Sequence, residues 1–168
     1  IDSLKNLITS NASDSLKIRA YNFLAHYYDM SDSTWAQDSA LYFLSRSKQL
    51  MRTSKNPTQS SYAFVKTEQI YNKLQYHDKA LDELLSFLET ARKNKKQSWE
   101  ADALSEIMEL FDFLKDTVRS EEYAQKLILF VDEVESKRTK ADCFNLLGSH
   151  YKDRSDYQKS LEFHNKSL

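Results

Sequence analysis

Four histidines and one cysteine are the residues of this 168-residue chain with the most potential for catalysis or metal binding. The histidines are His26, His77, His150 and His164, and no two have the HExxH spacing that places a pair of zinc ligands on one helix face. Cys143 stands alone, which excludes an internal disulfide and a cysteine zinc cluster. We therefore expect no catalytic residue and no metal site in this chain.

Glycine is almost absent, since Gly148 is the only one. A loop that cradles phosphate groups through its backbone needs several glycines, so this composition argues against a nucleotide cofactor. We expect no cofactor and no enzyme activity here. An enzyme accessory domain stays open as a function, but it would need a catalytic segment outside these residues.

Charge is balanced along the chain, with 24 basic and 25 acidic residues and a net charge of −1. No broad basic surface is expected, which argues against nucleic acid as a partner. The one basic cluster lies at residues 92–96, where a solvated loop is a better interpretation than a phosphate site. No apolar run approaches the ~20 residues that a membrane-spanning helix needs.

An all-α fold is predicted from the composition and from the spacing of apolar residues. One glycine and one proline leave little material for β-turns. Tyr21, Leu24 and Tyr28 recur three and four positions apart, which is typical of a helix face and not of a strand. The pattern predicts about nine helices of roughly 15 to 19 residues joined by short loops.

Three helix starts are predicted from capping residues. Asp116 is expected to be an N-cap, and Ser155 with Gln158 to form a capping box. Asn56 followed by Pro57 is expected to be an N-cap with proline at the first helical position.

The arrangement of these helices is indicated by internal repetition. Short loops make neighbouring helices antiparallel, which fits either a bundle or a stack of helix hairpins. Four segments align with one another: YNFLAHYY, FVKTEQIY, LSEIMELF and FNLLGSHY, which begin at residues 21, 64, 104 and 144. The steps of 43, 40 and 40 residues favour the stack of hairpins. Each copy continues into a second helix with a small residue at its start: Ala40, Ala80, Ser120 or Ser160.

The last copy resembles the tetratricopeptide repeat, a hairpin of two helices with conserved large and small positions. Its matching residues are Ala141, Phe144, Leu147, Gly148, Tyr151, Tyr157, Ser160 and Ser167, and His164 stands where the second-helix aromatic is expected. The copies depart from that family at Thr67, Glu68 and Met108, and their period of about 40 exceeds the usual 34. Gly148 is expected where two backbones cross closely, although a helix C-cap would also account for it.

The resemblance implies an α-solenoid, a right-handed superhelix of about four hairpins plus an N-terminal helix. We predict one repeat domain over residues 1–168, with repeats at approximately 13–52, 57–94, 98–134 and 137–168. Tyr28, Tyr71, Phe111 and Tyr151 recur at one inward position, so we expect them in the core. Cys143 stands where the family usually has alanine, so we expect a buried thiol.

The resemblance also implies a concave groove, lined by the first helix of each hairpin, that binds a protein or peptide segment. Residues at the groove positions are Arg19, Asn22, His26, Asp29, Tyr62, Val65, Gln69, Asn72, Asp102, Ser105, Glu109, Asp112, Asp142, Asn145, Ser149 and Lys152. The lysine needed to grip a chaperone's C-terminal carboxylate is replaced at positions 22, 65, 105 and 145, which argues against that role. Carboxylates at positions 102, 109, 112 and 142 favour a basic segment, and a solvated helix face is the equal alternative.

The opening stretch, residues 1–28, resembles the start of tetratricopeptide sensor regions in bacterial signalling proteins. That resemblance implies the input part of a histidine kinase or DNA-binding regulator and favours a place outside the inner membrane over the cytoplasm, which stays open. The chain begins at Ile1 and stops at Leu168 within an apolar helical pattern, so we expect it to be a piece of a longer protein. The alternative is a structural or oligomerisation spacer whose end repeats self-associate.

Overall fold

The computed structural model describes residues 1–31, 33–53 and 62–168. These residues form nine α-helices and one short 3₁₀ helix and contain no β-strand, so the prediction of an all-α helical-repeat fold is confirmed. They divide into two compact units, residues 1–83 (unit 1) and residues 84–168 (unit 2). Within the described ranges, none of the helices combines the length and apolar character needed to cross a membrane. A single continuous repeat domain stays a prediction.

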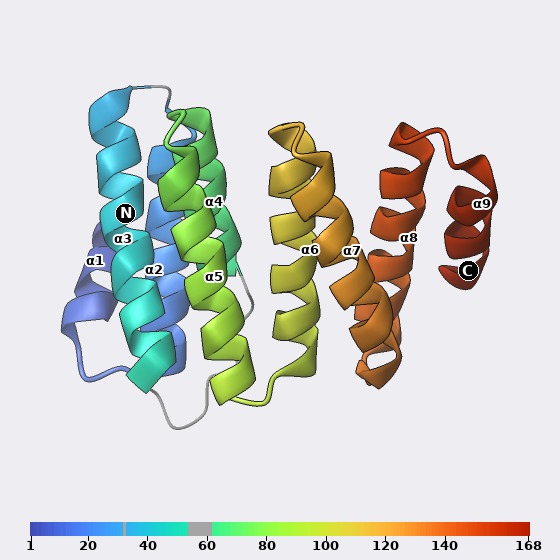
Figure 1. The fold of residues 1–168 in the computed structure, drawn as a ribbon. Helices are drawn as coiled ribbons and strands as arrows, with labels where there is room; N and C mark the ends of the chain where they lie inside the picture. The colour runs from blue at the N-terminus through green and yellow to red at the C-terminus, as the bar shows by residue number, and fades with distance from the viewer. Residues whose placement is uncertain (32, 54–61) are drawn as a thin grey trace. The chain divides into compact units, whose positions relative to one another are not determined.

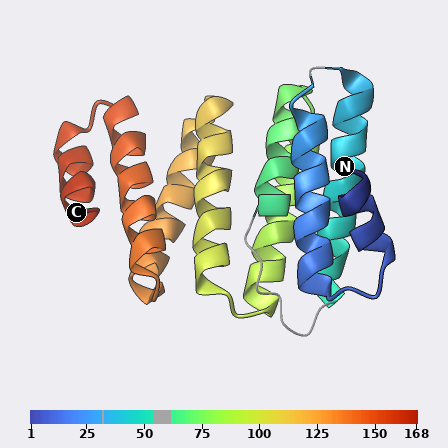
Figure 2. The same ribbon diagram turned by 180° about the vertical axis from the view of Figure 1, so that it is seen from behind.

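Unit 1 contains four helices and the start of a fifth. They are α1 (Asp2–Thr9), α2 (Asp14–Asp29), α3 (Thr34–Thr53), α4 (Tyr62–Lys73) and the first residues of α5 (His77–Lys93). Helices α2 and α3 lie side by side and run in opposite directions (Figure 1). Helix α1 packs on α2, which is clearest from behind (Figure 2). The core of the unit is formed by Ile18, Leu24, Leu44, Met51, Phe64 and Ile70.

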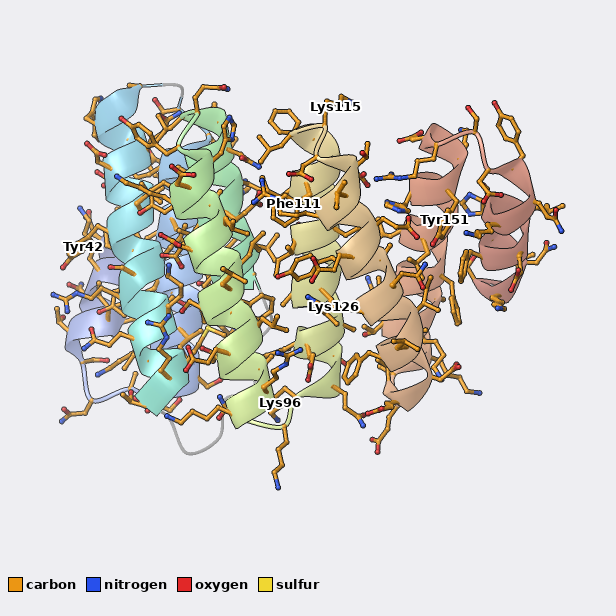
Figure 3. All side chains as sticks on the ribbon, in the orientation of Figure 1. Tyr42, Lys96, Phe111, Lys115, Lys126 and Tyr151 are labelled. Carbon is orange, nitrogen blue, oxygen red and sulfur yellow. The ribbon has the colours of Figure 1, made fainter. Side chains whose placement is uncertain are left out.

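Unit 2 begins within α5 and contains two complete hairpins. The first pairs α6 (Gln97–Phe113) with α7 (Thr117–Phe130), and the second pairs α8 (Lys137–Asp153) with α9 (Tyr157–Lys166). A 3₁₀ turn, η1 (Val131–Glu133), connects them. Figure 3 marks Phe111 on α6 and Tyr151 on α8, and both side chains are buried. Each fully buried large apolar side chain contributes about 1.5–3 kcal/mol, so Leu84, Phe87, Leu104, Ile107, Leu127 and Leu147 dominate the cohesion of this unit.

Four helix ends share one turn geometry. The second residue after the helix has a left-handed backbone, with φ of 61° at Gln75, 52° at Lys95, 61° at Lys115 and 61° at Ser155. In each turn the next amide donates back to a carbonyl five residues earlier, as Asp116 N does to Phe111 O at 2.9 Å. This is the bond pattern of the Schellman helix end, which normally has glycine at the left-handed position. Its recurrence at residues 75, 115 and 155 confirms the 40-residue period from the backbone alone.

Small residues lie where the helices of a hairpin are closely packed. Ala25 on a first helix and Ala40, Ala80, Ser120 and Ser160 on second helices are all buried, as the repeat pattern predicts.

Gly148 lies in the middle of α8, and its backbone is not left-handed, so the C-cap interpretation is wrong. A Cβ at this position would lie 2.6 Å from the imidazole ring of His164 on α9. The close neighbour of Gly148 is thus the His164 ring, one turn beyond Ser160, and the glycine makes room for it.

Several local predictions can be compared with the structure. Asp116 is the N-cap of α7, as predicted, and its side chain accepts a hydrogen bond from Arg119 N. The capping box at Ser155 is wrong: Ser155 occupies the left-handed turn, and Asp156 caps α9 by accepting from Lys159 N. The cap at residues 56 and 57 falls outside the described residues.

The predicted helix count holds for the described residues, but helix length varies more than expected, from 8 residues in α1 to 20 in α3. Among the expected core aromatics, Phe111 and Tyr151 are buried, whereas Tyr28 and Tyr71 are only half-buried. The prediction of a buried thiol at Cys143 is confirmed.

Candidate functional site

The predicted groove positions lie on the first helices α2, α4, α6 and α8, and their exposure differs. Exposed members are Arg19, His26, Gln69, Glu109, Asp142, Asn145, Ser149 and Lys152. Half-buried members are Asn22, Asp29, Tyr62, Val65, Asn72, Asp102 and Asp112, and Ser105 is buried.

Most of the half-buried positions in unit 1 hold helices together. Asn22 accepts a hydrogen bond from the Ser47 hydroxyl of α3 at 2.7 Å, which links the two helices of one hairpin. Asp29 at the end of α2 forms an ion pair with Lys66 of α4 at 2.7 Å. These side chains already have partners within the fold, so a ligand would have to compete for them.

The groove positions at the α4–α5 turn are also occupied internally. Asn72 donates to the buried Glu68 at 2.6 Å, and its carbonyl oxygen lies 2.8 Å from Nδ1 of His77. The hydroxyl of Tyr62 is buried and has no hydrogen-bond partner among the described residues. Burial, with a contribution from nearby Asp29, raises the pKa of this phenol. Unit 1 therefore offers mainly Arg19, His26 and Gln69 to a ligand.

In unit 2, the first helices α6 and α8 carry exposed carboxylates at Glu109 and Asp142 and a half-buried one at Asp102. Asp102 of α6 and Asp142 of α8 both act on the thiol of Cys143, whose pKa is raised to about 11 by burial first and by these two charges next. The thiol contacts the Ser105 hydroxyl of α6 at 3.8 Å, where the two first helices meet. Packing around its carboxyl group and the charge of Asp112 raise the pKa of Glu109, although this residue is exposed by surface area.

We call Asp102, Glu109 and Asp142 the acidic face of unit 2. Asp142 has one basic neighbour, Arg138, at 3.9 Å, and both side chains are strongly exposed. A surface pair of this kind contributes little, so Asp142 keeps its negative charge toward solvent. The neutral groups Asn145 and Ser149 lie on the same helix α8, where Asn145 accepts a hydrogen bond from His164 at 3.0 Å. The first helices of unit 2 thus carry both charged carboxylates and neutral hydrogen-bonding side chains.

Asp112, which the sequence placed with this acidic face, belongs instead to a buried network. We call this network the His150 cluster: His150 and Arg154 of α8, Asp112 of α6, and Ser120 and Glu121 of α7. His150 is only 2% exposed. Its Nδ1 lies 2.8 Å from Oδ2 of Asp112, and its Nε2 lies 3.2 Å from Oε2 of Glu121.

The remaining bonds of the cluster tie Asp112 to two further groups. The Ser120 hydroxyl donates to Asp112 Oδ1 at 2.5 Å, and Arg154 Nη1 donates to the same oxygen at 2.8 Å. Arg154 Nη2 donates to the Ser120 hydroxyl at 3.0 Å. One cluster thereby joins three helices across both hairpins of unit 2.

Two carboxyl groups of the cluster are held in their charged form. Burial opposes ionisation of Asp112, but hydrogen bonds from Ser120, His150 and Arg154 outweigh it and lower the pKa of this carboxyl group. Burial likewise opposes ionisation of Glu121, and bonds from Gln125, His150 and Tyr151 lower its pKa. Burial first, and the bond to Glu121 next, raise the pKa of Tyr151, which stays protonated and donates to that carboxylate at 3.0 Å.

The cluster contains the residue types of a hydrolytic triad without the geometry of one. The nucleophilic serine of a triad donates to the histidine nitrogen opposite the one that the carboxylate orients. Here Ser120 and Asp112 lie on the same nitrogen, Nδ1, and the serine donates to the carboxylate. Ser120 is also fully buried. No group of three or more His, Cys, Asp and Glu side chains among the described residues could hold a metal ion.

The sequence reasoning missed His150, Glu121, Arg154 and the polar role of Ser120. A usable signal was present at His150. In the repeat register, the equivalent positions of the second and third copies are Ile70 and Leu110, which are both buried. A histidine at a position that other copies fill with aliphatic residues indicates a buried polar group that needs partners.

Comparisons with known proteins add fold-level information. No protein family description matches the sequence, and no curated protein sequence matches it. Among the solved structures that match is the crystal structure of BtubC (BKLC) from P. vanneervenii. The two chains superpose with a TM-score of 0.69 at 17% sequence identity, over 99% of this chain and 68% of BtubC. This similarity supports the helical-repeat fold and, at this identity, nothing finer.

Proposed function

We propose that this chain is a non-catalytic, tetratricopeptide-like binding module whose acidic face in unit 2 binds a basic protein or peptide segment. The observation that carries the proposal is the placement of exposed Glu109 and Asp142 and half-buried Asp102 on the two first helices α6 and α8. These carboxylates have no part in the His150 cluster, which has its own internal charge partners. Opposite charge on a partner would favour encounter and orientation.

We further propose that the module is the sensor or input part of a bacterial signal-transduction or transcription-regulatory protein. The support is the resemblance of residues 1–28 to the start of such sensor regions. The helical fold is compatible with this role but serves many others, so the role depends on the partner.

The test is capture of partners by the immobilised chain from lysate of its own organism, with two matched variants. Glu109→Gln with Asp142→Asn neutralises two charges of the acidic face. Glu122→Gln with Glu162→Gln neutralises two exposed carboxylates on the second helices α7 and α9, where each is paired with a lysine one turn away. We expect capture to be lost with the first variant and kept with the second. Equal capture by both would refute the acidic face as the binding site.

A second function, self-association, is favoured by exposed apolar side chains near both ends of the described chain. Leu16, Phe23 and Tyr27 of α2 and Met30, the C-cap residue of that helix, are 45–76% exposed. On α9, Tyr157 and Leu161 are 68% and 64% exposed. Exposed apolar side chains that gather on one surface often mark a contact site. Sedimentation velocity over a range of protein concentrations separates the two functions. A chain that self-associates shows a mass that rises with concentration. A chain that stays monomeric throughout refutes self-association and leaves the binding function as the sole proposal.

A further inference from the structure

Both ring nitrogens of His150 face groups that only accept hydrogen bonds. Asp112 and Glu121 are held as carboxylates, and a carboxylate has no proton to donate. The Nδ1 contact with Asp112 at 2.8 Å and the Nε2 contact with Glu121 at 3.2 Å are therefore both satisfied only if each nitrogen carries a proton. A histidine with a proton on both nitrogens is the positively charged imidazolium.

Two donors lie near Nδ1 of His150: the Ser120 hydroxyl at 3.4 Å and Nη1 of Arg154 at 3.1 Å. The serine already donates to Asp112 at 2.5 Å. Arg154 does not need the imidazole as an acceptor either. Its guanidinium donates to Asp112 at 2.8 Å, to Ser120 at 3.0 Å and to the backbone carbonyl of His150 at 3.4 Å. Because the Asp112 contact is shorter than the Arg154 contact, Nδ1 of His150 is hydrogen-bonded to the Asp112 carboxylate.

The charges of the cluster balance only with the imidazolium. Asp112 from α6 and Glu121 from α7 contribute two negative charges, and Arg154 from α8 contributes one positive charge. A neutral His150 would leave one uncompensated negative charge beside a side chain that is 2% exposed. The other groups at the ring are the Ser120 hydroxyl at 3.4 Å and the edge-on ring of Tyr151, which is neutral. At the start of α9, Asp156 acts on Tyr151, and Lys159 lies 4.6 Å from the centre of that ring. These two groups pair with each other at 3.6 Å, so together they add no net charge.

We propose that the His150 cluster is a proton-operated latch between the α6–α7 and α8–α9 hairpins. With its proton, His150 makes two charge-assisted bonds, one to each helix of the first hairpin. Without it, one of those bonds becomes a contact between a lone pair and a carboxylate, and the cohesion of unit 2 weakens. The latch needs no binding partner, so its test is independent of the test of the proposed binding function.

The direction of the pH effect follows from which form of His150 makes both hydrogen bonds. The latch contributes stability while His150 holds its proton, and this contribution is lost when the ring gives the proton up at higher pH. Hydrogen bonds to charged groups exceed neutral ones enough to expect about a tenfold larger unfolding constant at pH 8 than at pH 6 from this cluster.

The experiment uses fluorescence confined to unit 2. The chain has two tryptophans, Trp35 in unit 1 and the buried Trp99 in unit 2, so Trp35→Phe leaves Trp99 as the sole reporter. Urea unfolding of this single-tryptophan chain is measured at pH 6 and pH 8. His150→Gln is expected to abolish the tenfold difference. His26→Gln, which removes an exposed histidine of unit 1, is expected to keep it. Equal pH dependence with and without His150 would overturn the proposal.

A second measurement does not depend on the variant folding. In the unaltered chain at pH 6, ring protons on both nitrogens of His150 should be detectable by nitrogen-edited NMR, protected from exchange and bonded to carboxylates. At pH 8 one of them should be lost. Detection of one ring proton at pH 6, or no change between the two pH values, would also overturn the latch.

Discussion

Replacing Gly148 with alanine tests why the chain keeps one glycine. The new Cβ would lie 2.6 Å from two atoms of the His164 ring, which is too close, so the ring has to move. Its movement breaks the hydrogen bond to Asn145 and strains the side chain. An exposed neutral bond and an off-rotamer torsion each cost on the order of 0.5–1.5 kcal/mol.

The opposing contribution is helix propensity. Alanine in a helix interior is favoured over glycine by about 1 kcal/mol, and Gly148 lies in the middle of α8. We therefore expect Gly148→Ala to lower the free energy of unfolding by about zero to 2 kcal/mol. Once His164→Ala removes the ring, the same substitution should stabilise the chain by about 1 kcal/mol.

The assay is urea unfolding of the four chains in the cycle: the parent, each single variant and the double variant. The Trp99 reporter, buried in unit 2, serves here as well. The coupling between positions 148 and 164 is the quantity of interest, because it removes the propensity contribution common to both backgrounds. A stabilisation of about 1 kcal/mol in both backgrounds would mean that the ring does not need the glycine, and the account of this residue would fail.

Three further outcomes are expected. Lys115→Gly and Ser155→Gly, at left-handed turn positions, should each raise the free energy of unfolding by about 1 kcal/mol, because glycine has no steric penalty there; no gain in urea unfolding would contradict the turn assignment. Asp116→Ala removes the cap bond to Arg119 N and should lower the free energy of unfolding, whereas Asp116→Asn, which keeps an acceptor, should lower it much less. Folding lowers the pKa values of Asp112 and Glu121, so their carboxylates stabilise the fold at pH values above the ordinary pKa of these groups, and this stabilisation is lost as the pH falls through the folded-state pKa values. The stability of the chain should therefore fall in acid, and a steep fall that Asp112→Asn does not flatten would contradict this.

The helical fold could be predicted because its signals are local. The spacing of apolar residues predicts the helices, and the recurrence of small residues such as Ala80 and Ser120 predicts their pairing into hairpins. The turns could not be predicted from composition, because Lys115 and Ser155 occupy left-handed positions where glycine would have been the signal. Their strain is maintained by the hydrogen bonds of the turn and the packing of the flanking helices.

The candidate site could be predicted only in part, since exposure and pairing are tertiary properties. Register alone placed Asp112 and Glu109 together on one binding face. The structure separates them: Asp112 contacts residues up to 42 positions away, at Arg154, while Glu109 stays exposed. A repeat pattern identifies which helix face a residue occupies, but it does not show which neighbouring helix supplies a counter-charge.

The most direct test of the proposed binding function is the affinity of a captured partner for the two charge-neutralised chains. The account predicts that Glu109→Gln with Asp142→Asn weakens binding tenfold or more at low salt and reduces its salt dependence. Glu122→Gln with Glu162→Gln should bind as tightly as the parent chain. Equal affinities for the two variants would contradict the acidic face of unit 2 as the site of recognition.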